Sequence, residues 1–264
     1  MVWLSVIIPT VNDPALANTV REVQEKSRTH PEILVMADAV DVKLTGVIVV
    51  RNSKRLGLRG NVNNGVMLAN GEWLVKLDDH CMLSDGWDEI LLASAQKDWV
   101  VVPRRYQLDP VQWCICEDDS APIDYERLDI GHSDKIGGVT WRSRRKERAE
   151  ISIDETMVTQ GSFYLMHRDH WNRIGPLDEA NYGPFTQEGI EIALKTWLGG
   201  GKVMVNKQAW YAHKHRRFGR VIAPRGEDVR RGNAYSKDYW LNNRWEGRVH
   251  DLSWLMERFG LPCP

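Results

Sequence analysis

The stretch VIVVRNSKRLGLRGNVNNGVMLANGEWLVKLDDH, residues 47–80, contains two apolar runs with a helix-like segment between them. Residues 46–50 are rich in β-branched side chains and residues 72–77 form a second apolar run, so both are predicted strands. Residues 61–69 have helical composition and stop at Asn70-Gly71. A strand, a helix and a strand in this order predict two parallel strands that are joined by a crossover helix.

The same alternation begins at the N-terminus and returns after residue 150. Residues 5–9 and 32–36 are predicted strands on either side of a helix over residues 15–28. Further strands are predicted at residues 99–103, 159–166, 202–205 and 209–211, and further helices at residues 168–174 and 186–198. The predicted fold class is α/β, with a mainly parallel sheet that is covered by helices on both faces.

Length and composition are those of an ordinary globular protein. The chain has 264 residues, of which 42% are hydrophobic and 27% charged, and its net charge is -1. We expect a catalytic domain over residues 1–220, with a charged insertion at residues 104–150, and a C-terminal extension over residues 221–264 that packs on it. The four cysteines lack the spacing of a zinc site. No apolar run approaches the roughly 18 residues of a membrane span and no leader pattern is evident, which predicts a cytoplasmic protein.

Polar side chains follow the predicted strands at the points where the strands end. Thr10 and Asp38 follow the first two strands, and the triplet Asp78-Asp79-His80 follows the strand at residues 72–77. Because ligands bind beyond the carboxyl ends of parallel strands, these side chains are expected to face one crevice. A single polar residue at such a position is more often a turn former. Two adjacent carboxylates are costly to desolvate unless a cation joins them, so the triplet predicts a metal site.

Several motifs along the chain carry a resemblance to a known family. They are SVIIPT (residues 5–10), the run VIVV…SDGW (47–87), QGSFYLMHRDHWNRIGPLDE (160–179), FTQEGIEIALKTWLGGGKVMV (185–205) and WYAHKHR (210–216). In this order they resemble family 2 glycosyltransferases, and within them the branch of the polypeptide N-acetylgalactosaminyltransferases, over about residues 4–217 without the insertion. The resemblance implies the Rossmann-like GT-A fold and a hexosyl- or N-acetylhexosaminyltransferase activity.

The resemblance gives the triplet a specific role. In similar enzymes the first and third residues of this motif bind a divalent ion, Mn²⁺ or Mg²⁺, which implies Asp78 and His80 here. Those enzymes take another ligand from a histidine after a late strand, and His213 matches it. Such an ion acts as a Lewis acid on the diphosphate of a nucleotide sugar, and a set of carboxylate and imidazole ligands suits Mn²⁺. Outside this pattern His213 would be a surface histidine.

The resemblance also assigns residues to the donor. Thr10, Asp38 and Asp79 are assigned to donor binding, and Arg59 lies close to a basic residue that the family places after its Leu-Gly. After the second strand the chain departs from the family pattern, because Ala37-Asp38-Ala39 stands where two acids and a Gly-Ser are usual. The implied donor is a nucleotide sugar, and more specifically a UDP-sugar.

The acceptor side is implied by residues 187–191, which resemble the family's acidic motif at a helix start. Glu188 would be the catalytic carboxylate nearest to the acceptor hydroxyl, acting together with Asp78, and the insertion at residues 104–150 would lie on this side. In an inverting enzyme Glu188 would be the general base; in a retaining one it would orient the acceptor or stabilise the oxocarbenium-like state. Glu191, one turn further along, is the alternative to Glu188, or a helix surface charge.

The identity of the acceptor is predicted from charge. From residue 202 onward the chain has 13 Lys or Arg against 6 Asp or Glu, and residues 142–148 add a second basic segment. Tyr235, Tyr239, Trp240 and Trp245 lie among the C-terminal basic residues. This combination suits a polyanion with stackable bases, so the first expected acceptor is a hydroxymethylated base in DNA, as for some bacteriophage enzymes in an infected bacterium. A glycan or polysaccharide precursor, a protein acceptor, a nucleotidyltransferase and an inactive nucleotide-sugar-binding module are the alternatives.

Overall fold

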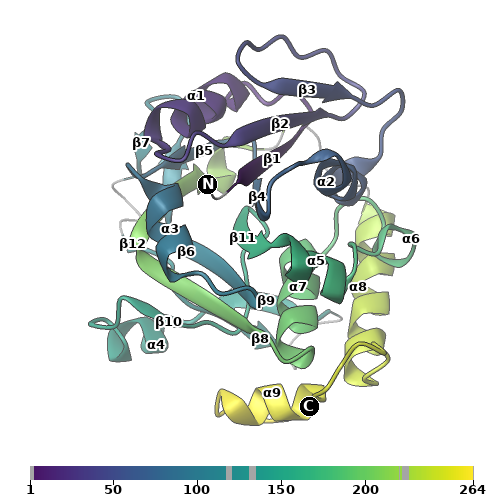
Figure 1. The fold of residues 1–264 in the computed structure, drawn as a ribbon. Coiled ribbons are helices and arrows are strands. Elements are labelled where there is room, and N and C mark those ends of the chain that lie inside the picture. Colours follow the sequence, from purple (N-terminus) through teal and green to yellow (C-terminus); the bar gives the residue numbers. More distant parts are fainter. Residues whose placement is uncertain (1–2, 117–120, 131–134, 220, 222–225, 264) are drawn as a thin grey trace.

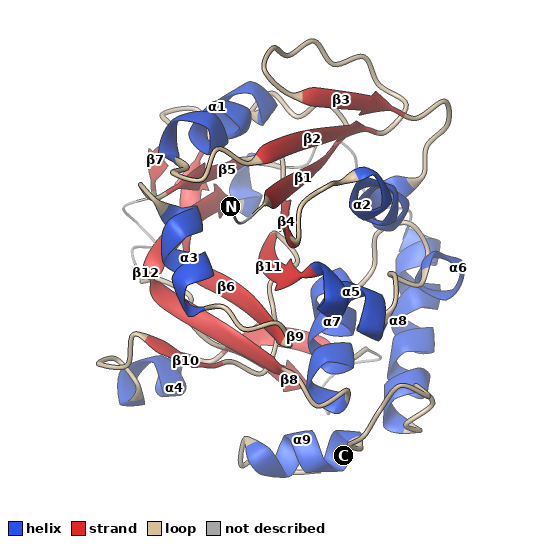
Figure 2. Ribbon diagram, in the orientation of Figure 1, coloured by secondary structure: helices blue, strands red, loops and turns tan. Residues whose placement is uncertain are grey.

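The computed structural model describes residues 3–116, 121–130, 135–219, 221 and 226–263 (Figures 1 and 2). Its centre is a mixed sheet with helices packed on both faces, and the main path of strands runs β10-β12-β6-β11-β4-β1-β2-β3. The α/β class that was predicted from the sequence is confirmed. The helices are α1 (Leu16–Lys26), α2 (Gly57–Leu68), α3 (Trp87–Ser94), α4 (Arg142–Glu147), α5 (Arg168–Ile174), α6 (Glu179–Tyr182), α7 (Glu188–Leu198), α8 (Gly226–Leu241) and α9 (Leu252–Arg258).

The first half of the sheet is parallel, as the strand and helix alternation predicts. It consists of β1 (Leu4–Thr10), β2 (Glu32–Ala37), β3 (Ile48–Arg51) and β4 (Trp73–Leu77). The second half mixes directions, because β11 (Phe163–His167) runs antiparallel to both β4 and β6 (Trp99–Asp109). Short antiparallel strands complete this half: β5 (Cys81–Leu83), β7 (Cys114–Ile115) and β10 (Ile153–Glu155).

Residues 202–211 form one long strand, β12 (Lys202–Lys214), and not the two strands that were predicted. The apolar pattern is interrupted because β12 contains a bulge, where its register against β6 shifts between Asn206 and Trp210. The Asn206 side chain stabilises the bulge by accepting a hydrogen bond from the backbone of Gln208 at 3.0 Å. As a result β12 continues far enough to pair with β5, which sets His213 directly opposite Cys81, the residue after His80.

The core lies on both faces of the sheet, because successive side chains of a strand point to opposite faces. Ile7 of β1 packs in the cluster that holds Val62 and Val66 of α2. Its neighbours Val6 and Ile8 pack in the opposite cluster, with residues of α1 and α3. Burial on both faces therefore fixes the strand ends, and with them the position of the polar residues that follow.

The charged insertion divides into two parts. One part extends β6 and adds a two-stranded sheet, β8 (Glu126–Asp129) with β9 (Gly137–Thr140). The other part is α4, which lies beside β10, where the Arg144 side chain donates to the Glu155 carbonyl at 3.2 Å. Because β10 pairs with the beginning of β12, α4 lies at the opposite end of that strand from His213.

The C-terminal residues pack against the second half of the sheet. The Trp240 indole of α8 donates to the Tyr182 hydroxyl at 2.7 Å, and the Phe259 ring meets Trp197 of α7 edge to face at 5.4 Å. Within the described residues, no helix has the length and apolar character needed to cross a membrane.

A buried ion pair connects α2 to α7. Arg59, in the first turn of α2, is fully buried, and its guanidinium donates to the Glu191 carboxylate and to the Thr186 carbonyl. Glu191 also pairs with Lys195 at 2.7 Å and accepts from the backbone of Asp178 at 3.1 Å. Glu191 is therefore a structural residue, and the choice between Glu188 and Glu191 as the carboxylate near the acceptor favours Glu188.

Replacing Glu191 with alanine should lower the free energy of unfolding by about 3–5 kcal/mol, because the Arg59 guanidinium would stay buried without its carboxylate. Urea-induced unfolding followed by tryptophan fluorescence measures this change. Glu25→Ala, at an exposed position of α1, is the matched control and should change the free energy by less than about 0.5 kcal/mol. Equal effects of the two substitutions would contradict this role of the pair.

Candidate functional site

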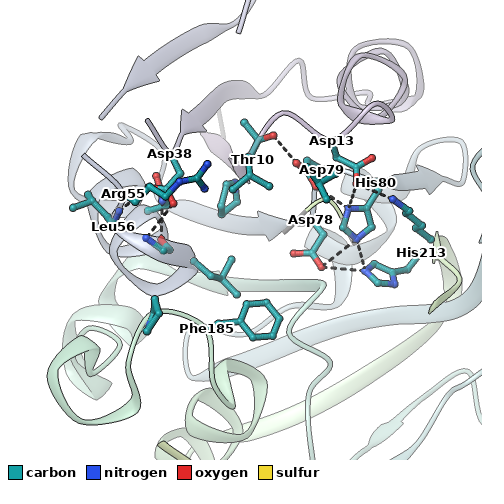
Figure 3. A pocket seen from close by; sticks show the side chains of 18 of the residues that line it. Thr10, Asp13, Asp38, Arg55, Leu56, Asp78, Asp79, His80, Phe185 and His213 are labelled. Atoms are coloured by element: carbon teal, nitrogen blue, oxygen red, sulfur yellow. Dashed lines mark hydrogen bonds and ion pairs between the residues drawn. The ribbon is translucent and has the colours of Figure 1, made fainter. Parts of the chain in front are cut away.

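A cavity of about 560 Å³ opens beyond the carboxyl ends of β1, β2 and β4, where the sheet topology predicts a ligand site. Six residues that were singled out from the sequence line it: Thr10, Asp38, Asp78, Asp79, His80 and His213 (Figure 3). Thr10 comes from the end of β1, the triplet Asp78-Asp79-His80 from the turn after β4, and His213 from the end of β12. Segments more than 130 residues apart in the sequence therefore meet at this cavity.

Asp78, His80 and His213 converge on one point. The Nε2 atom of His213 lies 3.0 Å from Nε2 of His80 and 3.0 Å from Oδ2 of Asp78, and the latter two atoms are 3.9 Å apart. The three residues thus form a group whose ligand atoms lie within 4.8 Å of one another. Asp13, Asp79 and His80 form a second such group, but Asp13 is also bound to Lys214 at 2.9 Å, which leaves it less free to hold a cation.

The electrostatics of the group formed by Asp78, His80 and His213 favour a charged carboxylate at Asp78 and a neutral imidazole at His213. Burial alone would raise the pKa of Asp78, but the Lys76 ammonium and the two imidazoles outweigh it and hold the pKa well below its usual range. Burial lowers the pKa of His213 to about 4, although Asp78 opposes this shift. Burial lowers the pKa of His80, but the hydrogen bond to Asp79 and the nearby carboxylates together outweigh burial and raise this pKa.

Asp79 lines the cavity, and its carboxylate is engaged by the neighbouring site residues. Its Oδ1 atom lies 2.7 Å from Nδ1 of His80, and its Oδ2 atom accepts the Thr10 hydroxyl at 2.5 Å. The Thr10 oxygen accepts in turn from the backbone N–H of Asn12 at 2.8 Å. Thr10 and Asp79 both line the cavity, but their side chains are held in one hydrogen-bonded chain that ends at His80.

Asp38 lines the opposite wall of the cavity and holds the start of α2. Its carboxylate accepts from the backbone N–H groups of Leu56 at 2.7 Å and Gly57 at 3.1 Å. The helix consequently begins four residues before the predicted residue 61, and Arg59 turns into the core. The assignment of Arg59 to donor binding is therefore corrected: Arg59 is fully buried and does not line the cavity, whereas Arg55 does.

Glu188 lies at the first turn of α7, on a second cavity that shares Asp78 and His213 with the first. It is buried, its Oε1 atom accepts the Tyr164 hydroxyl at 2.7 Å, and among the described residues its Oε2 atom has no hydrogen-bond partner. Burial raises the pKa of Glu188, and the Lys76 ammonium only partly offsets this.

Lys76 is a site residue that the sequence interpretation missed. Its buried ammonium donates to Asp78 and to the Gly161 carbonyl, and it lies 3.5 Å from Glu188. Burial lowers the pKa of Lys76, but Asp78 and Glu188 more than reverse this effect and keep the ammonium charged. The signal was present in the sequence, since a lysine in an otherwise apolar strand needs a buried partner.

Comparison with known proteins identifies the N-terminal part of the chain. Residues 5–113 match the family model described as glycosyl transferase family 2. The chain is 26% identical over 226 residues to a putative polypeptide N-acetylgalactosaminyltransferase 13 of Drosophila melanogaster, covering 80% of this chain and 36% of that protein. It is 25% identical over 271 residues to the polypeptide N-acetylgalactosaminyltransferase 3 of Taeniopygia guttata, and the match covers 89% of this chain and 42% of that protein. The chain thus spans less than half the length of these relatives.

Two further matches bear on fold and on activity. An inactive polypeptide N-acetylgalactosaminyltransferase-like protein 5 of Macaca fascicularis is 26% identical over 157 residues, which cover 60% of this chain and 35% of that protein. The crystal structure of GalNAc-T7 with UDP, GalNAc and Mn²⁺ superimposes with a TM-score of 0.74 at 21% identity, over 93% of this chain and 49% of that one. Residues 5–113 therefore resemble glycosyl transferase family 2, the chain as a whole is similar in sequence to polypeptide N-acetylgalactosaminyltransferases, and its fold is the GT-A fold of the GalNAc-T7 structure.

Proposed function

We propose that this chain is a metal-dependent glycosyltransferase, which moves a sugar from a UDP-sugar to a hydroxyl group of an acceptor. The observation that carries the proposal is the convergence of Asp78, His80 and His213 on the wall of the larger cavity. The homology to N-acetylgalactosaminyltransferases and the UDP and Mn²⁺ in the similar GalNAc-T7 structure support the donor and the metal.

The three converging residues fit a divalent ion. Bonds of about 2.1 Å at right angles separate neighbouring ligand atoms by about 3 Å, which is the spacing of His213 to both of its partners. Two imidazole nitrogens and one carboxylate oxygen are a donor set that suits Mn²⁺ better than an all-oxygen site would. When bound, the ion would neutralise charge that develops on the departing diphosphate.

The residues around the ion have roles in the transfer. The acceptor oxygen bonds to the anomeric carbon, while the bond from this carbon to the diphosphate oxygen breaks and the diphosphate leaves with the electron pair. Glu188 accepts a hydrogen bond from the acceptor hydroxyl through its Oε2 atom, which accepts no hydrogen bond from the described residues. The proton passes to Glu188 if the configuration inverts, and to the departing phosphate oxygen if it is retained. The Lys76 ammonium keeps Asp78 charged and orients Glu188.

The donor's nucleoside is assigned to the side of the cavity that is formed by Thr10, Asp38 and Arg55. Asp38 and Thr10 bring fixed oxygen atoms to this wall, because each is held by neighbouring groups. Arg55 adds a cation to the wall of the cavity that carries Asp38.

The hypothesis of a hydroxymethylated base in DNA as acceptor loses much of its support. In the basic segment at residues 142–148, Arg148 is bound to Asp154 at 2.9 and 3.0 Å, and Arg144 lies 3.9 Å from the same carboxylate. Among the C-terminal aromatic residues, Trp240 is fully buried and Tyr235 stacks on Tyr239. Arg144, Arg148 and Trp240 are thus engaged in contacts within the fold, which weakens the argument from charge and aromatic residues for a nucleic-acid acceptor.

Replacing Asp78 with asparagine should lower the rate of UDP-sugar hydrolysis or transfer in Mn²⁺ by at least about 100-fold, because the site loses a charged ligand. The assay is a screen of UDP-sugars by release of UDP, with thermal unfolding to check that the variant is folded. Asp85→Asn, at an exposed carboxylate between β5 and α3 that does not line the cavity, is the control and should retain full rate. Full activity of Asp78→Asn would overturn the metal assignment, and a wild-type chain that binds UDP without releasing sugar would identify an inactive module.

Replacing Asp79 with asparagine should weaken Mn²⁺ binding by about 10–100-fold without removing a metal ligand. The Asp79 carboxylate holds Nδ1 of His80 and so directs Nε2 towards His213, and such supporting hydrogen bonds tune metal affinity by this amount. Titration of Mn²⁺ followed by electron paramagnetic resonance measures the dissociation constant, again with Asp85→Asn as the control. An unchanged constant would mean that Asp79 contacts the donor and does not support the metal.

A further inference from the structure

A second cavity, of about 320 Å³, adjoins the first and has walls that the proposed donor does not use. Asp78, His213 and Phe185 line both cavities, so the second opens directly beside the metal ligands. Its far wall carries Arg105, from the extension of β6, and Glu126, from β8. Neither residue lines the larger cavity, and neither belongs to the motifs that carry the family resemblance.

Arg105 differs from its neighbour Arg104 in a way that indicates a ligand. Adjacent side chains of a strand point in opposite directions. Arg104 is fully used by the fold, because it forms two hydrogen bonds with Asp124 at 2.6 and 2.9 Å. The Nε–H group of Arg105 is buried and has no hydrogen-bond partner among the described residues. A buried N–H group without a hydrogen-bond acceptor is costly, and a ligand that accepts this hydrogen bond removes the cost.

Two carboxyl groups face the same cavity with hydrogen-bonding capacity to spare. Glu126 forms no ion pair within 4.0 Å and no side-chain hydrogen bond among the described residues, and burial raises its pKa despite the nearby Arg105. Glu188 also lines this cavity, and its Oε2 atom lies 3.5 Å from the Lys76 ammonium but has no hydrogen-bond partner among the described residues. The cavity thus combines carboxyl acceptors with a guanidinium donor.

We propose that Arg105 and Glu126 form the acceptor subsite, and that they select an uncharged carbohydrate. Adjacent hydroxyls of a sugar ring both donate and accept, so one ring can satisfy Glu126 and Arg105 while presenting another hydroxyl to Glu188. Asp78, Glu126 and Glu188 line this cavity together with Lys76 and Arg105, so the lining carries no excess of positive charge that would favour a polyanion such as nucleic acid. This inference rests on the proposed function, since it assumes that the donor sugar is delivered beside Asp78.

The test compares three classes of acceptor. The donor in every assay is the UDP-sugar that the wild-type chain hydrolyses in the presence of Mn²⁺. The acceptors are uncharged methyl glycosides and disaccharides, a DNA duplex with hydroxymethylcytosine, and a peptide with serine and threonine. Mass spectrometry should detect transfer to saccharides. Transfer only to DNA or to peptide, or donor hydrolysis with no transfer to any saccharide, would overturn the carbohydrate assignment and leave the proposed donor chemistry intact. A wild-type chain that neither binds UDP nor hydrolyses any UDP-sugar would overturn both.

Two variants test the residues. Arg105→Ala and Glu126→Gln should each raise the KM for the saccharide at least tenfold, while the KM for the donor in hydrolysis changes less than twofold. Arg127→Ala is the matched control, because Arg127 neighbours Glu126 on β8 but does not line the cavity. The KM values of Arg127→Ala for the saccharide and for the donor should equal those of the wild type. Variants that lose hydrolysis and transfer in parallel, or that keep the acceptor KM of the wild type, would show that Arg105 and Glu126 do not hold the acceptor.

Discussion

The pairing of β12 with β5 is the constraint on which the site depends. It sets His213 against Cys81, so that the imidazole of a strand from the C-terminal half reaches the triplet that follows β4. As a result, Nε2 of His213 lies 3.0 Å from Nε2 of His80 and 3.0 Å from Oδ2 of Asp78 on the cavity wall. The bulge in β12 makes this pairing possible, because it lets one strand follow β6 along its whole length.

Ion pairs and hydrogen bonds link the charged side chains around Asp78, His80 and His213. Lys76 joins Asp78 to Glu188, so the proposed metal ligands and the proposed acceptor side share one ammonium group. On the other side Asp79 joins His80 to Thr10. Of the three proposed ligands, Asp78 and His80 are thus each held by a further side chain, which limits the movement that a bound ion would need to induce. The buried Arg59–Glu191 pair fixes α7 and thereby the position of Glu188.

The positions of the strands and of the triplet that follows β4 could be predicted from the sequence. The positions of Arg59, Arg105 and Glu126 could not, because they depend on contacts between distant segments. The apolar run before Asp78 predicts a buried strand, and its end predicts where the triplet lies. Arg59 was assigned wrongly because Asp38 caps α2 from a distant strand, which no local pattern reveals. Arg105 and Glu126 were missed because residues 104–150 lack a regular hydrophobic period, and only tertiary packing brings them to one cavity. The catalytic and donor-binding roles of the residues stay predictions.

The most direct test of the account is pulsed electron paramagnetic resonance of Mn²⁺ bound to the chain together with UDP. The account predicts modulation from the nitrogens of two imidazoles, those of His80 and His213, and coupling to the phosphorus nuclei of the diphosphate. Loss of one nitrogen coupling in His213→Ala would assign that ligand. Bound Mn²⁺ without nitrogen coupling, or with no phosphorus coupling when UDP is present, would contradict the claim that these residues hold the ion on the donor.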